Sequence, residues 1–515
     1  MALAVAASAG AHESGRRAVF VGVTLLAALG VSVLLRWQTL LLAALGLVLV
    51  EALARRFWVN DVALFFVKDV ALAVAYAKFG LERLAARRPL VPRSAVGLVL
   101  LAFAALCVLE LANPRLPALA VGANGLHAWV WYLPVVALAA AAFPTARDAV
   151  AALRLLGFVS VPLAVLAAVQ IWALALNESY YQKIHSNAVY SIGTRIVKDR
   201  SVSTFASTGA YADFVVFSVI VAFALVLGAR NRRRVAEVVV VFAGIVLAIG
   251  GSGSRGVATA IVVALAIFVA VHRRRDTRTG LALSLTGSLV LLSFIASGPL
   301  PGLDRAIATG LSRSSIEERV QEHVAKPIDG VTTTGTTFGT TPTPTTPTAT
   351  TPAPTTPAPT PTTVGEGVPL AGSETVHVDR STTLVTALVG NGVGLGAGGG
   401  QYLGSFLSAR QLAETVALAG PEAGWLGIAW EFGVAGLLLF VALFALVGVN
   451  AWRTFRDSDD EDVRTLALAG ILLIGVTGTL MSLSTKLGAV SFTLYFWFFV
   501  GLAVAAGRFA ADARR

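Results

Sequence analysis

The sequence predicts an all-α, polytopic integral membrane protein. Hydrophobic residues make up 56% of the 515 residues and charged residues only 13%, whereas a soluble domain is about a quarter charged. The mean hydropathy is +0.76. Several apolar runs extend over about 18 residues or more with few charges, which as helix is enough to cross about 30 Å of hydrocarbon. Composition and run length together therefore predict that the chain is embedded in a membrane.

Thirteen apolar runs are candidates for spans, and one of them is unusual. The run 59–79 carries Asp61, Lys68, Asp69 and Lys78, each expensive to place in lipid, so we expect it to form an interfacial or re-entrant helix. About twelve spans with both chain ends inside are then predicted, and thirteen spans with the N-terminus outside are the alternative. The other runs fall near 18–35, 39–54, 94–112, 127–143, 149–175, 210–229, 235–250, 257–271, 279–297, 423–448, 463–484 and 488–507.

Loop charges predict the orientation of the spans. The stretches 228–234, 272–278 and 451–464 and the C-terminal tail are rich in arginine and lie on one side by alternation. Cytoplasmic loops carry an excess of Lys and Arg, so this side is predicted to be cytoplasmic. The long stretch 298–422 then faces outward as one large extracytoplasmic loop.

The chain divides by composition into four parts. Residues 1–93 are expected to hold the first membrane segments, 94–297 a membrane helix bundle, 298–422 the outer loop, and 423–515 the last membrane helices with a short tail. Within the loop, 331–363 consist mainly of Thr and Pro. Such a segment has little to bury and is expected to be extended and disordered, either as an O-glycosylated stalk or as an unmodified spacer.

Several classes of function are excluded by composition. The net charge of +11 suggests a nucleic-acid partner, but the arginines cluster in short loops between apolar runs, as topology requires. The single cysteine, Cys107, excludes an intrachain disulfide. The six histidines are scattered without metal-ligand spacing, so we expect neither a metal site nor another cofactor.

Six segments, in this order, resemble the O-antigen ligase and polymerase superfamily of bacterial membrane glycosyltransferases. Each is weak alone, but their order and membrane placement are specific. They are LELANPRLPALAVGANGLHAWVWYLPVV (109–136), RSVSTFASTGAYADF (200–214), GSGSRGVATA (251–260), IEERVQEH (316–323), LVGNGVGLG (388–396) and EAGWLGIAWEFGVAG (422–436).

The resemblance implies a metal-independent glycosyltransferase, a polymerase or a ligase, on the outer face of the bacterial cytoplasmic membrane. Its donor would be a glycan linked to polyprenyl diphosphate, and its acceptor a glycan or another hydroxyl compound. A transporter or flippase of lipid-linked glycan has similar charge requirements and is the alternative. Internal repeats and broken helices near the midplane would favour that alternative.

Arginines are the predicted substrate-binding groups. Arg255 lies in a short turn that should face outward, where topogenic arginine is not expected, and a guanidinium pairs bidentately with phosphate oxygens. The alternative is a loop charge that reaches water. By resemblance, Arg200 matches the family arginine before a span, with Arg195 as its competitor. Arg319 and Arg380 flank the Thr/Pro segment and are either site residues or solvated charges.

Glu422 marks a departure from the family. The ligases carry a His-Asn pair before the helix that re-enters the membrane, whereas this chain has Glu422 and Ala423 there. Glu422 is therefore a candidate general base for an acceptor hydroxyl. It is equally well explained as a carboxylate favoured by a helix N-terminus.

The predicted orientation is tested by cysteine labelling. In a Cys107→Ser background, Thr340→Cys should react with a membrane-impermeant thiol reagent in intact spheroplasts. Arg275→Cys should react only after permeabilisation, because basic loops stay cytoplasmic. The reverse pattern would overturn the outer-face assignment of 298–422.

Overall fold

A computed structural model describes eleven stretches of the chain. They are 15–57, 62–90, 94–116, 119–176, 203–205, 208–229, 231–252, 254–272, 390–393, 424–482 and 490–515. All of the described helices belong to one unit, formed by 1–306 with 382–515. Residues 307–381, with the Thr/Pro segment, lie outside the described residues.

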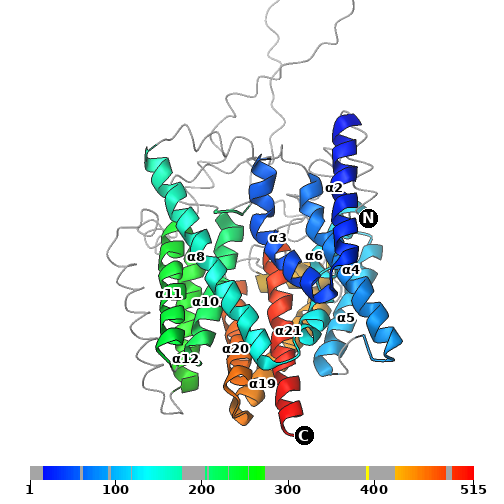
Figure 1. The fold of residues 1–515 in the computed structure, drawn as a ribbon. Coiled ribbons are helices and arrows are strands. Elements are labelled where there is room, and N and C mark those ends of the chain that lie inside the picture. The colour runs from blue at the N-terminus through cyan, green and yellow to red at the C-terminus, as the bar shows by residue number, and fades with distance from the viewer. Residues whose placement is uncertain are drawn as a thin grey trace, which may run out of the picture. The chain divides into compact units, whose positions relative to one another are not determined.

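Every regular element in the described stretches is helical (Figure 1). Six of these helices are long and apolar enough to cross a membrane: α5 with the following turn (Ala95–Ala112), α8 (Ala146–Leu176), α10 (Thr208–Val226), α19 (Gly424–Asp457), α20 (Glu461–Met481) and α21 (Val490–Ala513). Shorter apolar stretches lie in α2 (Gly15–Leu34), α3 (Trp37–Phe57) and α12 (Arg255–His272). The remaining long helices are α4 (Val62–Ala85) and α11 (Arg232–Ser252). The architecture is that of an all-α protein compatible with a membrane.

The run 59–79 falls mainly in helix α4, a helix of 24 residues. Its contacts align it antiparallel to α3, because Trp37 Nε1 donates to Glu82 Oε2 at 2.7 Å and Lys68 Nζ lies 2.9 Å from Glu51 Oε2. Helix α4 therefore packs along α3, and its interfacial or re-entrant placement in a membrane stays a prediction.

The charges of α4 are satisfied inside the protein. Lys68 and Asp69 are 1% and 3% exposed. Lys68 pairs with Glu51, and Asp69 accepts from Tyr132 Oη at 2.9 Å and lies 3.1 Å from His127 Nε2. Buried charges of this kind are tolerated when they are paired and hydrogen-bonded, which explains how so polar a helix packs in an apolar bundle.

Lys78 has a different role on the same helix. Its Nζ donates to the backbone carbonyls of Ser32, Val33 and Leu35, the bond to Val33 being 2.6 Å. These carbonyls lie at the C-terminal end of α2, where they lack intrahelical donors. The ammonium therefore caps α2 and fixes the turn between α2 and α3.

The run 127–143, expected as one span, is instead two short helices. They are α6 (Leu119–Trp129) and α7 (Val135–Ala142), joined by a turn at 130–134. Pro134 precedes α7 and has no backbone N–H to donate. The break frees the Trp131 carbonyl, which accepts a hydrogen bond of 2.8 Å from Tyr76 Oη. A neighbouring helix thus satisfies the backbone where the span is interrupted.

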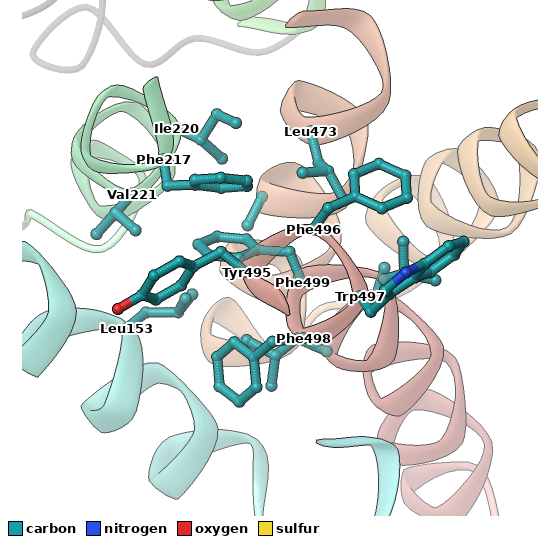
Figure 2. Packing of buried hydrophobic residues seen from close by; sticks show 14 of the residues in the cluster. Leu153, Phe217, Ile220, Val221, Leu473, Tyr495, Phe496, Trp497, Phe498 and Phe499 are labelled. Atoms are coloured by element: carbon teal, nitrogen blue, oxygen red, sulfur yellow. The ribbon is translucent and has the colours of Figure 1, made fainter. Parts of the chain in front are cut away.

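Aromatic residues of α21 form the centre of the core. Figure 2 shows Tyr495, Phe496, Trp497, Phe498 and Phe499 pointing to different sides of α21, with Phe217 of α10 beside Tyr495 and Leu473 of α20 beside Phe496. All five are at most 2% exposed. The Phe217 ring of α10 lies 5.6 Å from Tyr495 and 5.3 Å from Phe499 between centroids. Helix α10 is buried on all sides from Tyr211 to Val226, which explains its low amphipathicity.

One end of the bundle gathers basic residues, and we call it the basic end. Arg234 Nη1 lies 3.6 Å from Glu461 Oε1, and Arg508 Nη2 donates to the Phe143 carbonyl at 2.8 Å. The first contact joins 228–234 to 451–464, and an added Cβ at Gly507 would lie 3.7 Å from Thr454 Oγ1, which places the C-terminal helix beside 451–464 as well. The charge pattern predicted that these segments share one side; the fourth predicted segment, 272–278, lies almost wholly outside the described residues. The second half of α19, 434–457, leads from the opposite end to this one over about 36 Å of helix.

Candidate functional site

The candidate site is organised around a break in α19. Gly433 has a φ of 63° and a ψ of −164°, a non-helical conformation inside the element. The rings of Trp425 and Phe444 lie 5.1 Å apart, although a continuous helix would separate residues so far apart in sequence by about 28 Å. The first arm of α19, 424–432, therefore folds back along the second. Only glycine adopts this φ without a steric penalty.

The break leaves backbone carbonyls to be satisfied, and the segment 390–393 satisfies them. The backbone N–H of Asn391 donates to the Trp430 carbonyl at 2.9 Å, and the backbone N–H of Gly392 donates to the Glu431 carbonyl at 3.1 Å. Gly390 has a φ of 86°, and an added Cβ would lie 2.3 Å from the Glu431 carbonyl oxygen. Glycine at 390 is thus required both by conformation and by close backbone approach.

A turn after α5 forms the second wall of the site. Asn113 closes it, because its Oδ1 accepts from the Arg115 amide at 3.0 Å and its Nδ2 donates to Glu110 Oε2 at 2.8 Å. The same Nδ2 lies 3.4 Å from the Gly390 carbonyl. Arg115 Nη1 donates to Asn391 Oδ1 at 2.7 Å. The turn and segment 390–393 are therefore locked together by side chains of both. We call this region the Asn391 end.

Two buried carboxylates lie at this end. Glu110 is 1% exposed, and among the described residues its Oε1 has no hydrogen-bond partner. Glu431 is 4% exposed, and its Oε2 accepts from Trp129 Nε1 at 2.9 Å. A carboxylate is costly to bury without hydrogen-bond donors. Buried ionisable groups are typical of functional sites.

Helix α6 connects this site to the buried charges of α4. Its Trp129 contacts Glu431, while His127, two residues earlier, contacts Asp69. Tyr132 in the following turn contacts the same carboxylate. The position of Trp129, and with it the partner of Glu431, therefore depends on a network anchored in α4.

Of the predicted site residues, the structure describes only the backbone of Arg255. Arg255 begins α12, directly after Ser254, whose carbonyl accepts from Val257 N at 3.1 Å. Its side chain lies outside the described residues. So do Glu422, Arg195, Arg200, Arg319 and Arg380. Three residues beyond Arg200, Ser203 is fixed on α8, because its Oγ donates to the Leu163 carbonyl at 2.8 Å.

The site residues that the sequence reasoning missed are Glu110, Asn113, Arg115 and Asn391. A signal was available, since all four lie in segments that carry the family resemblance, 109–136 and 388–396. No group of three metal-binding side chains occurs in the described stretches.

The role of Gly390 is tested by Gly390→Ala. The Cβ clashes with the Glu431 backbone, and the positive φ costs about 1 kcal/mol or more, so the apparent melting temperature in detergent should fall by several degrees. Gly46→Ala is the matched control, because a Cβ there has nothing within 4 Å and alanine favours a helix. Equal melting temperatures for the two variants would contradict the capping role of segment 390–393.

Comparison with known proteins adds no family assignment. No protein-family model matches the chain, and no curated protein matches it. The site is therefore interpreted from its residues and their geometry.

Proposed function

We propose that the chain is a membrane glycosyltransferase, a polymerase or ligase of surface or extracellular polysaccharide. The proposal is supported by one observation above all. Three segments chosen for their resemblance to O-antigen ligases and polymerases, 109–136, 388–396 and 422–436, meet through hydrogen bonds at the Asn391 end. Segments so far apart in the chain that carry one family's pattern and share one site are expected of a functional unit.

The proposed location is the outer face of the bacterial cytoplasmic membrane. Arg234 and Arg508 lie at the basic end, which the positive-inside rule assigns to the cytoplasm. The Asn391 end then faces outward with the loop 298–422. The proposed topology has about twelve spans, or thirteen if α4 crosses the bilayer.

The proposed reaction joins an acceptor hydroxyl to the anomeric carbon of the donor glycan. The hydroxyl oxygen forms the new bond, the bond from that carbon to the diphosphate oxygen breaks, and polyprenyl diphosphate leaves. Arg255 and Arg200 would stabilise the negative charge that develops on the leaving group. Glu422 would accept the hydroxyl proton as general base. Neither a metal nor another cofactor is required by this scheme.

A transporter or flippase of lipid-linked glycan is the second candidate, and the break between α6 and α7 favours it. Transporters place binding sites at interrupted helices near the membrane midplane. The break also lies beside His127 and the buried Asp69 and Tyr132, and intramembrane ionisable groups often mark transport paths. Reconstituted protein separates the candidates: glycan transfer in nanodiscs supports the enzyme, and movement of unmodified lipid-linked glycan across a vesicle supports the transporter.

The arginine hypothesis predicts that Lys does not replace Arg at 255 or 200. An ammonium lacks the planar fork that pairs with two phosphate oxygens, and loss of one such donor should lower the transfer rate by about 100-fold or more. The rate is measured in a single turnover from purified lipid-linked donor. Wild-type rates for both Arg→Lys variants would mean that these residues serve topology alone.

Glu422→Gln separates the two explanations of that residue. Gln keeps the size and loses the basicity, so transfer should fall by about 100-fold or more if Glu422 is the base, while donor binding is retained. If Glu422 only favours a helix N-terminus, the change costs about 1 kcal/mol or less of local stability. An unchanged single-turnover rate in folded protein would remove Glu422 from the mechanism.

A further inference from the structure

Arg115 lies at the Asn391 end, opposite the basic end with Arg234 and Arg508. It lies three residues beyond the apolar stretch Ala95–Ala112, so it is expected at the level of the lipid headgroups. An arginine at this level can reach the phosphate groups of a lipid-linked ligand.

The guanidinium of Arg115 is held in a fixed orientation. Asn391 is 6% exposed, and both its backbone N and its Nδ2 donate to the Trp430 carbonyl, at 2.9 and 3.0 Å. Because the NH₂ group is used in this way, Oδ1 faces Arg115 and accepts from Nη1 at 2.7 Å. The backbone N of Arg115 is also fixed, by Asn113. A preorganised arginine loses less conformational entropy on binding a ligand.

The charge of Arg115 is not neutralised by the described part of the protein. Among the described residues, no carboxylate lies within ion-pair distance of it. Glu110, on the same turn, is buried and bonded to Asn113 instead. A guanidinium carries five N–H donors, and Asn391 accepts from one nitrogen. A half-buried cation whose other donors meet no acceptor among the described residues is suited to an anionic ligand.

We propose that Arg115, positioned by Asn391, binds the diphosphate of a polyprenyl-diphosphate-linked substrate. This inference rests on the proposed function and names a further arginine for the binding of the donor headgroup. The fork of the guanidinium matches two phosphate oxygens, and the bond to Asn391 keeps that fork at the predicted outer headgroup level. Arg115 is thus a binding residue and Asn391 a positioning residue.

The test measures binding of polyprenyl diphosphate to the full chain in phosphatidylcholine nanodiscs. Arg115→Gln removes the charge, and Arg115→Lys keeps the charge but not the fork. The control is Arg147→Gln, which alters an exposed arginine near the basic end. Hydrogen bonds to charged groups are worth about 1.5 to 3 kcal/mol, so Arg115→Gln should weaken binding by about 10-fold to 100-fold. Arg115→Lys should weaken binding less, and Arg147→Gln should leave it unchanged.

Competition identifies the source of the anion. Inorganic pyrophosphate should compete with the lipid, whereas phosphatidylglycerol added to the nanodisc should not. Displacement by phosphatidylglycerol would overturn the diphosphate assignment in favour of a general anionic headgroup. Wild-type affinity in both Arg115 variants would overturn the inference and leave the proposed function standing. No binding by the wild-type protein would instead remove the donor of the proposed function, and the inference with it.

Discussion

The Asn391 end depends on one constraint, that every backbone carbonyl freed by a helix break must find a donor when water is excluded. Gly433 breaks α19, and the carbonyls of Trp430 and Glu431 lose their helical partners at that point. Backbone N–H groups of Asn391 and Gly392 replace those partners. The glycines at 390 and 433 follow from this constraint, because the backbones approach too closely for a side chain and turn through positive φ.

The same constraint brings distant parts of the sequence together. Once segment 390–393 caps the first arm of α19, Asn391 meets Arg115 and Gly390 meets Asn113. Behind this site, α6 carries Trp129 to Glu431 and His127 to Asp69. A buried charge on α4 is therefore connected, through one short helix, to a buried carboxylate of α19.

Packing elsewhere is dense and apolar, which gives these polar groups a rigid support. The buried aromatic residues of α21 pack beside Phe217 of α10 and Leu473 of α20 (Figure 2). Small residues permit close helix contact, since a Cβ at Gly501 would lie 2.6 Å from the Ala139 Cβ and one at Gly470 2.7 Å from the Ala503 Cβ. Close contacts of this kind are typical of helices in a bilayer, where packing and not the hydrophobic effect drives helix association.

The sequence by itself determined the helical class and the apolar runs that are long enough to cross a membrane, because these follow from local composition and run length. It could not decide how α4 buries its charges, since the cost of Lys68 and Asp69 depends on Glu51, His127 and Tyr132, which are distant in sequence. Nor could it identify the pairing of Arg115 with Asn391, because these two residues lie 276 positions apart in the chain. Hydrogen-bond partners of buried groups are set by how helices pack, and only the tertiary structure decides that.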